Sequence, residues 1–236
     1  TKYVSHSVAM FPHGASSVYP PQFLQFTGTP NVSAASFYQC RGVRDMAYMV
    51  TFGFSPGEKV DMANAKAILL IGSHLGENVH VSHLKQYLKG LENGAKLIVV
   101  DPRFSAAAAK ADVWMKIKPG TDTALLMAIM NYLLNKGLYD KKFVADNCIG
   151  LPELKKGLAH ASLEWAAKTC DLPAAQIKEV AEILGKNLPN VSIHPGRHTT
   201  WHGNDFQRIR AQACLTAILG AYAVPGGLIR PKSMKL

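Results

Sequence analysis

Two apolar segments of this sequence each end at residues that can bind a polar ligand. One segment ends at Asp101 and Arg103, and the next ends at Gly120 and Asp122. A carboxylate accepts hydrogen bonds from a ribose or from the edge of a guanine ring, whereas arginine and backbone N–H groups bind phosphate. This spacing of residue types indicates a nucleotide-type ligand at the ends of buried strands.

The hydrophobic pattern indicates which elements position these residues. Four apolar, β-rich runs are predicted to be buried strands because both of their faces are apolar, and they cover residues 65–73, 95–103, 113–120 and 190–197. Apolar residues recur at helical spacing in residues 80–94, 124–137, 173–187 and 204–220. Strands that alternate with helices predict an α/β fold, with a mainly parallel sheet and helices on both of its faces.

Several residues mark where the helices begin and end. Asp122 stands where it can cap the helix that follows it, and Gly137 is a helix stop. Residues 1–39 are rich in proline and are predicted to form ordered loop and short strand. His80 and His83 fit the surface of their helix, and no role is assigned to them.

Open parallel sheets bind ligands at the carboxyl ends of their strands. In this chain those ends are Gly72-Ser73-His74, Asp101-Pro102-Arg103, Pro119-Gly120-Thr121-Asp122 and Pro195-Gly196-Arg197. Asp, Gly and Pro are also ordinary turn residues. Their recurrence at four strand ends nevertheless favours a single ligand crevice.

Composition narrows the classes of partner. The 236 residues are 48% hydrophobic and 18% charged, so the chain can bury a core, and its formal net charge is +10. A phosphate-bearing cofactor or a small anionic substrate suits this charge, although surface lysines that only maintain solubility would also produce it. Nucleic acid is not favoured, because the basic residues are scattered and are not interleaved with aromatic residues.

Several other functional motifs are absent from the sequence. The four cysteines form no C-x-x-C pair, which argues against a zinc or iron–sulfur site built from this chain alone. The nicotinamide-binding and Walker fingerprints are absent. No apolar run reaches the roughly 18 residues that a membrane span needs.

Two long motifs carry a resemblance to a known family. AKAILLIGSHLGEN (65–78) and the stretch from NGAKLIVVDPRF to LYDKKFV (93–144) resemble the molybdopterin oxidoreductases of the dimethyl-sulfoxide-reductase type. The spacing from Gly28 to Cys40 fits the segment that delivers the metal ligand in that family. PGRHTTWHGNDFQRIRAQACLTAILGAYAVPGG (195–227) looks most like the thiosulfate and polysulfide reductase branch.

The resemblance implies a bis(molybdopterin guanine dinucleotide) cofactor with molybdenum or, less often, tungsten. Cys40 would be the protein thiolate on the metal, although a lone cysteine can also be a small buried hydrophobic residue. The family pattern places further residues around the cofactor: Gly72, His74, Glu77, Asp101, Arg103, Gly120, Asp122 and Trp201. The family often has Asn where His74 stands, and Trp201 could equally be a packing residue.

The residues beside the metal ligand bear on the substrate. Arg41 stands where formate dehydrogenases usually carry His, and a fixed cation there suits an oxyanion or a sulfur anion. Arg41 could instead bind the pterin or form a structural ion pair. Arg197 and His198 are further candidates for orienting an anion or for supplying a proton.

The resemblance therefore implies part of a catalytic subunit that reduces a small sulfur anion, polysulfide or thiosulfate. Formate, tetrathionate and arsenate remain alternative substrates, and a non-catalytic subunit that keeps the fold is an alternative of another class. Electrons would arrive through a [4Fe–4S] cluster elsewhere in the parent chain and through iron–sulfur and membrane-anchor subunits. Such a complex would lie in the periplasm or on the outer face of the cytoplasmic membrane.

The expected organisation is that of a portion of a larger subunit whose remaining domains complete the cofactor site. Residues 1–39 would belong to a neighbouring domain, residues 40–210 would form the Rossmann-like cofactor-binding domain, and residues 211–236 would lead toward the next domain.

Overall fold

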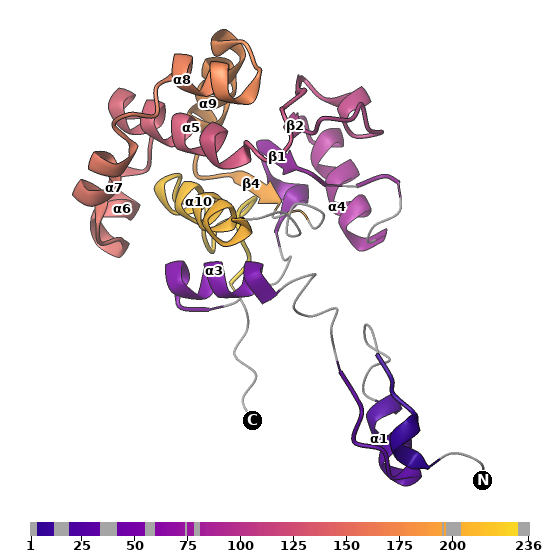
Figure 1. The fold of residues 1–236 in the computed structure, drawn as a ribbon. Coiled ribbons are helices and arrows are strands. Elements are labelled where there is room, and N and C mark those ends of the chain that lie inside the picture. The colour runs from indigo at the N-terminus through magenta and orange to yellow at the C-terminus, as the bar shows by residue number, and fades with distance from the viewer. Residues whose placement is uncertain are drawn as a thin grey trace.

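The structure is a computed structural model of the 236-residue chain (Figure 1). It describes residues 4–11, 19–33, 42–54, 60–73, 75–77, 81–194, 196 and 204–230. The N-terminal helix α1 is drawn apart from the helices that surround the sheet (Figure 1). No helix in the described ranges combines the length and the hydrophobicity that crossing a membrane requires.

A four-stranded parallel sheet lies at the centre of the fold. Its strands are β1 (Ala67–Ile71), β2 (Lys96–Val100), β3 (Val113–Met115) and β4 (Val191–His194), in the order β3-β2-β1-β4. Every neighbouring pair is parallel, which confirms the predicted sheet. β3 is shorter than expected because Lys118 N–H donates to the carbonyl of Cys170 and not to a neighbouring strand.

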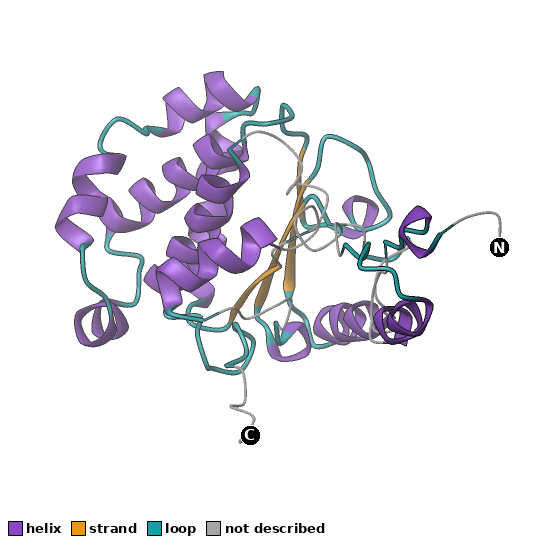
Figure 2. Ribbon diagram, turned by 60° about the horizontal axis from the view of Figure 1, so that its bottom comes forward, coloured by secondary structure: helices purple, strands orange, loops and turns teal. Residues whose placement is uncertain are grey.

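Side chains of successive strand residues pack alternately in two hydrophobic cores, one on each face of the sheet. On β1, Leu69 and Ile71 pack in the core with helices α5 (Asp122–Lys136), α8 (Leu163–Cys170) and α9 (Ala174–Asn187). Ile68 and Leu70 face the opposite core, to which helices α3 (Val43–Phe52) and α4 (Val81–Glu92) contribute. Figure 2 shows the sheet nearly edge-on with helices on both sides, as predicted.

Helix α10 (Asp205–Ile218) belongs to both cores. Leu215 packs in the core that contains α5, whereas Ile209 and Ala213 pack in the core that contains α3. The helix runs through residue 210, where a boundary between segments was expected. A single helix therefore spans residue 210, and the domain bounds stay a prediction.

Four helices were predicted at nearly their observed bounds, namely α4, α5, α9 and α10. The sequence did not reveal α3, α6 (Lys141–Asn147), α7 (Leu151–Leu158) or α8, because seven to ten residues give too few turns for a clear periodicity. Asp122 is not the cap of α5, since Thr121 is the N-cap and Asp122 is the first helical residue. Gly137 ends this helix with a φ of 68°, as expected.

The N-terminal segment contains more helix than expected. α1 (Tyr19–Thr27) lies in a region predicted to be loop and short strand. Its two prolines, Pro20 and Pro21, belong to its first turn, where a missing N–H and a fixed φ are compatible with helix. A single bridge between Met10 and Val32 is the only pairing in the described part of this segment.

Candidate functional site

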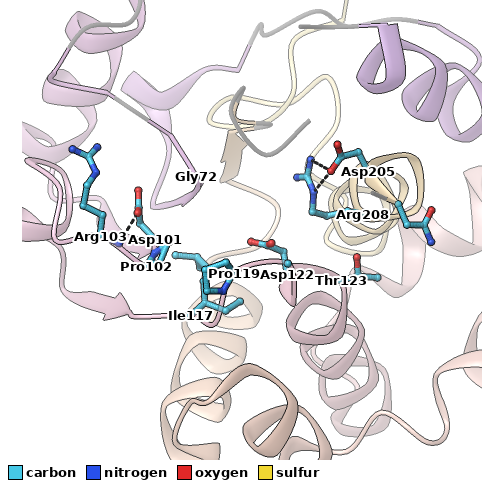
Figure 3. Close-up of a pocket in the computed structure, with 13 residues that line it drawn as sticks. Gly72, Asp101, Pro102, Arg103, Ile117, Pro119, Asp122, Thr123, Asp205 and Arg208 are labelled. Atoms are coloured by element: carbon cyan, nitrogen blue, oxygen red, sulfur yellow. Dashed lines mark hydrogen bonds and ion pairs between the residues drawn. The ribbon is translucent and has the colours of Figure 1, made fainter. Parts of the chain in front are cut away.

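A pocket of about 310 Å³ opens at the carboxyl ends of β1, β2 and β3. The residues that line it are Gly72, Val100, Asp101, Pro102, Arg103, Ile117, Pro119, Gly120, Asp122, Thr123, Asn204, Asp205 and Arg208. Figure 3 places Asp101 and Arg103 on one side, Asp205 with Arg208 on the other, and Asp122 between them. The polar ends of three of the four strands therefore meet at one pocket, as the sequence predicted, whereas no described residue at the end of β4 lines it.

The turn after β2 is fixed by its own aspartate. One carboxylate oxygen of Asp101 accepts a hydrogen bond from the backbone N–H of Arg103 at 2.8 Å. The indole Nε1 of Trp114 donates to the carbonyl oxygen of Asp101 at 2.9 Å. The rings of Phe104 and Trp114 meet edge to face, with centroids 4.8 Å apart. These contacts hold the buried Asp101 at the pocket wall.

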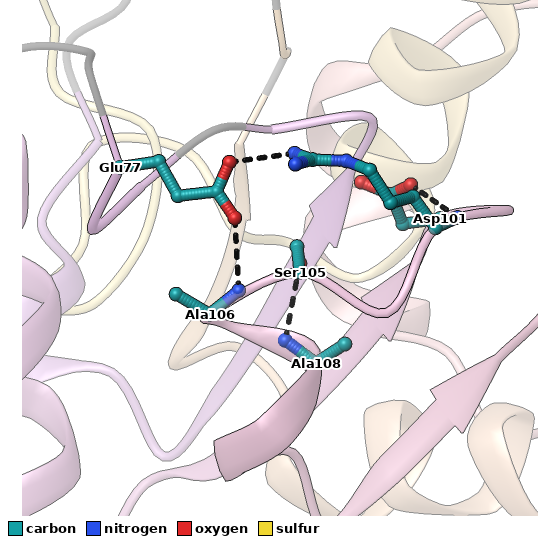
Figure 4. Close-up of polar contacts among 6 residues, drawn as sticks. Glu77, Asp101, Ser105, Ala106 and Ala108 are labelled. Carbon is teal, nitrogen blue, oxygen red and sulfur yellow. Dashed lines mark hydrogen bonds and ion pairs between the residues drawn. The ribbon is translucent and has the colours of Figure 1, made fainter.

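Glu77 connects two loops at the rim of the sheet (Figure 4). One of its carboxylate oxygens accepts from Arg103 Nη2 at 2.7 Å, and the other accepts from the backbone N–H of Ala106 at 3.0 Å. Ser105 Oγ then accepts from the N–H of Ala108 at 3.2 Å, which begins the next helical turn. Glu77 thus ties the loop after β1 to the loop after β2 and lies outside the pocket lining.

The N-terminal turns of α5 and α10 face each other across the pocket. Arg208 Nη2 lies 3.3 Å from Asp205 Oδ1, and both side chains are nearly fully buried. The first turns of the two helices contain Asp122 and Asp205, and a carboxylate at a helix N-terminus is stabilised by the helix dipole. Arg208 and the two helix N-termini favour an anionic ligand group, while the carboxylates of Asp122 and Asp205 favour hydrogen-bond donors.

Burial shifts the pKa values of two charged residues in this pocket, Asp122 and Arg208. It raises the pKa of Asp122, and the carboxylates of Asp205 and Asp101 add to this rise, while Arg208 opposes it. Burial also lowers the pKa of Arg208, while Asp122 and Asp205 oppose that change. A ligand that brings hydrogen-bond donors to Asp122 would replace the water that burial has removed.

Sequence reasoning did not assign the contribution of α10 to the pocket. Asp205 and Arg208 were recognised only as part of a predicted helix, and Asn204 as its start. The sequence did contain an indication of their role. Asp205 and Arg208 carry opposite charges three residues apart, at the start of a helix whose other buried residues are largely apolar. Only the packing of α10 beside α5 shows that they face Asp122.

The predicted site residues fall into three groups. Gly72, Asp101, Arg103, Gly120 and Asp122 line the pocket together. Glu77 supports Arg103 from the rim. The others lie outside the described residues, and they are Cys40, Arg41, His74, Arg197, His198 and Trp201.

Comparisons with known proteins identify the family of this chain. A family model described as "Molybdopterin oxidoreductase" matches residues 22–229. The chain is 33% identical to acetylene hydratase of Syntrophotalea acetylenica over 85% of this chain and 27% of that protein. It is 32% identical to the thiosulfate reductase molybdopterin-containing subunit PhsA of Salmonella typhimurium, over 74% of this chain and 23% of the relative.

A solved structure shares the fold. Acetylene hydratase from Pelobacter acetylenicus superposes with a TM-score of 0.73 at 32% sequence identity, covering 84% of this chain and 27% of that chain. The chain thus spans about a quarter of the length of the relatives it matches.

Proposed function

This chain belongs to the molybdopterin oxidoreductase family, and we propose that it is part of the catalytic subunit of an enzyme that reduces a small sulfur anion, polysulfide or thiosulfate. The family implies a molybdopterin cofactor that carries molybdenum. Similarity to a thiosulfate reductase subunit supports the sulfur anion, as does the cationic Arg41 beside Cys40 in the sequence.

The observation that carries the proposal is the donor and acceptor set of the pocket. Asp101 and Asp122 can accept hydrogen bonds from the N–H groups of a guanine base, while Arg208 and the N-terminal turns of α5 and α10 favour phosphate. A Cβ added at Gly120 would meet no atom within 4 Å, so the pocket wall is open there. A volume of about 310 Å³ suits one nucleotide end of the guanine dinucleotide form of the cofactor.

The remaining cofactor-binding roles rest on the resemblance. Cys40 would bind the metal as a thiolate, which suits a soft metal–sulfur centre. Further contacts would come from Gly72, His74, Glu77, Arg103 and Trp201. The bound metal would be molybdenum or tungsten, and it supplies the two-electron redox chemistry of the reaction.

The protein would bind and orient the substrate beside the metal. Arg41 and Arg197 would hold a sulfur anion by charge-assisted hydrogen bonds, and His198 would supply a proton to the departing sulfur. A second dinucleotide and a [4Fe–4S] cluster would be held by other domains of the same subunit. Iron–sulfur and membrane-anchor subunits would deliver the electrons, at the periplasmic face of the cytoplasmic membrane.

The experiment that tests the proposal uses the full-length protein that contains this chain. Mo, W and Fe are measured per chain, and turnover is assayed with polysulfide, thiosulfate, formate, tetrathionate and arsenate and an artificial electron donor. We expect about one Mo or W per chain and preference for a sulfur anion. Cys40→Ala should abolish turnover, whereas Cys148→Ala, at a half-buried cysteine that ends α6, should not.

Two results would contradict the proposal. Absence of both Mo and W would favour a non-catalytic subunit that keeps the fold. Normal turnover by Cys40→Ala with metal still bound would remove Cys40 from its proposed role as ligand.

A second function is favoured by the similarity to acetylene hydratase, which extends over more of this chain than the similarity to PhsA. Addition of water to acetylene transfers no net electrons. Consumption of acetylene by the metal-loaded protein without stoichiometric oxidation of a donor, together with inactivity toward sulfur anions, would support this function over the first.

A further inference from the structure

Helix α3 carries its charged and apolar residues on the opposite faces from those expected of a surface helix. Such a helix normally turns its charged residues toward water and its apolar residues toward the core. In α3 the two charged residues, Arg44 and Asp45, are buried, with 2% and 7% exposure. The most exposed side chains are apolar, since Met46, Met49 and Val50 are 61%, 55% and 62% exposed. These three residues form the apolar face of α3.

The spacing of the three residues makes this face continuous. Residues three and four positions apart lie beside each other on a helix, and positions 46, 49 and 50 have this spacing. All ten residues of α3 are described, and none of its charged residues is exposed. Single exposed apolar residues are ordinary, whereas a row of large ones without a charge marks a contact surface. Methionine suits such a surface because its flexible side chain adapts to a partner.

The opposite face of α3 is packed against the protein, which fixes the direction of the apolar face. Ala47 and Tyr48 are buried in the core to which α10 contributes. The ring of Tyr48 stacks on Phe52 with centroids 6.0 Å apart, and Phe52 lies 5.3 Å from the ring of Tyr222. Figure 1 shows α3 at the edge of the helical body with α10 on its inner side. The apolar face cannot turn inward without loss of these contacts.

The size and charge of the apolar face indicate what kind of surface covers it. The ten residues of α3 extend about 15 Å, whereas a stable interface between separate proteins takes about 20–30 residues from each partner. A domain of the same polypeptide needs less area, because the covalent connection gives it a high effective concentration. A membrane surface is a poorer occupant, since helices that bind it expose basic residues beside their apolar face, and Arg44 is buried.

The relatives of this chain contain enough further polypeptide to supply such a domain. The chain spans about a quarter of their length, so about three-quarters of each relative lies outside the shared part. We propose that a further domain of the same subunit packs an apolar surface against Met46, Met49 and Val50, so that α3 is held between that domain and α10. The inference rests on the proposed function only in that this chain is part of a longer subunit.

The first test is the oxidation of methionine in the full-length protein. A brief exposure to chloramine T converts accessible methionine to its sulfoxide, and mass spectrometry of peptides gives the rate at each position. The same protein unfolded in urea gives the reference rate for each peptide. Met62 and Met115, which are both 0% exposed, give the rate of a buried methionine in the folded protein.

We expect Met46 and Met49 to oxidise at least about tenfold more slowly in the folded monomeric subunit than in urea, as slowly as the two buried methionines. Oxidation close to the rate in urea would overturn the proposal. Protection that arises only when the subunit dimerises, or only when another protein or a membrane is added, would also overturn it, because the occupant would then not be the same polypeptide.

A pair of substitutions tests the same contact without an oxidant. Lysine is a good helix former and is favoured in the second half of a helix, so on a free surface Met49→Lys should leave α3 intact. Under a packed domain it places an unpaired charge in an apolar contact. We expect hydrogen–deuterium exchange of residues 43–52 to become at least about tenfold faster in Met49→Lys and to stay within about twofold in the matched control Met49→Leu. Equal exchange in the two variants would overturn the proposal.

These results are separate from those that test the proposed function. Protected Met46 and Met49 in a full-length protein without Mo or W would support the covered face of α3 and reject the proposed function. Accessible Met46 and Met49 in a protein that contains the metal and reduces a sulfur anion would reject the covered face and support the proposed function.

Discussion

Replacement of Gly90 by alanine should loosen α4, the helix that carries His83. Gly90 faces the short helix η4 (Met62–Asn64) and strand β1. An added Cβ would clash with the carbonyl oxygen of Met62 and would lie 2.8 Å from Cδ1 of Ile68. Ordinary contact begins at 3.4 Å, so the helix would have to move away from the sheet by more than about half an ångström.

The size of the effect follows from two opposing terms. Overpacking of a dense core costs about 1–3 kcal/mol. Alanine in place of glycine stabilises a helix by about 0.5–1 kcal/mol. The net expectation for Gly90→Ala is a destabilisation of about 1 kcal/mol or more, which raises the population of locally opened α4 by roughly fivefold.

A matched control is available in α7. A Cβ added at Gly157 would meet no atom within 4 Å, so Gly157→Ala introduces the helix-forming gain without the clash. It should stabilise its helix by about 0.5–1 kcal/mol. The same chemical substitution is thus expected to have opposite signs at the two positions.

Hydrogen–deuterium exchange of the full-length protein measures both effects locally. A local measurement is suitable because this chain covers only about a quarter of the length of its relatives. Peptides that cover residues 81–92 should exchange faster in Gly90→Ala, and peptides that cover residues 151–158 should exchange more slowly in Gly157→Ala. Unchanged or slower exchange of α4 in Gly90→Ala would refute the close packing on which the prediction rests.

Three further predictions concern polar groups. Arg208→Met removes the guanidinium beside the buried carboxylates of Asp205 and Asp122. It should lower the free energy of unfolding by about 3–5 kcal/mol, measured by chemical denaturation at neutral pH. A decrease below about 1 kcal/mol would contradict a buried ion pair. Burial holds the pKa of Asp122 above its unfolded value of about 3.9, so its ionisation destabilises the folded protein as the pH rises from that value through the native pKa. Asp122→Asn should therefore stabilise the protein at pH 7 and lose this advantage below about pH 4. If the difference in unfolding free energy between the variant and the unmodified protein were the same at all these pH values, the raised pKa would be excluded. Asp140→Ala removes the side-chain acceptor for the N–H of Phe143, at 2.8 Å, and should destabilise α6 by about 1 kcal/mol, measured as faster exchange of that helix.

The sequence allowed the sheet and one side of the pocket to be predicted, because these depend on local pattern. A strand with two apolar faces must be covered on both sides, so its polar groups can face a ligand only at its ends, and open parallel sheets bind ligands at the carboxyl ends. Asp101 directly follows β2, Asp122 begins α5 after the loop that follows β3, and both line the pocket. Cys40 stays a prediction because it lies outside the described residues.

The other side of the pocket and the contact between His83 and His194 depend on which elements become neighbours. His83 was predicted to lie on a helix surface, whereas in the structure its Nδ1 lies 3.1 Å from Nε2 of His194, a contact that arises only when β4 pairs with β1. Arg208 likewise meets Asp122 only after α10 has packed beside α5. No periodicity in the sequence specifies that β4 adds at the β1 edge and not beyond β3.

The position of α10 explains how a site made from distant segments keeps its dimensions. Its first turn supplies Asp205 and Arg208 to the pocket, and its length packs against α5 on one side and α3 on the other. α3 begins at Val43, three positions after Cys40 in the sequence. Under the proposed function, α10 holds one end of the dinucleotide and also supports α3, the helix that follows the metal ligand Cys40 in the sequence. A change in the packing of α10 should therefore alter cofactor retention and metal ligation together, while a change at the rim, such as Glu77, should affect cofactor retention alone.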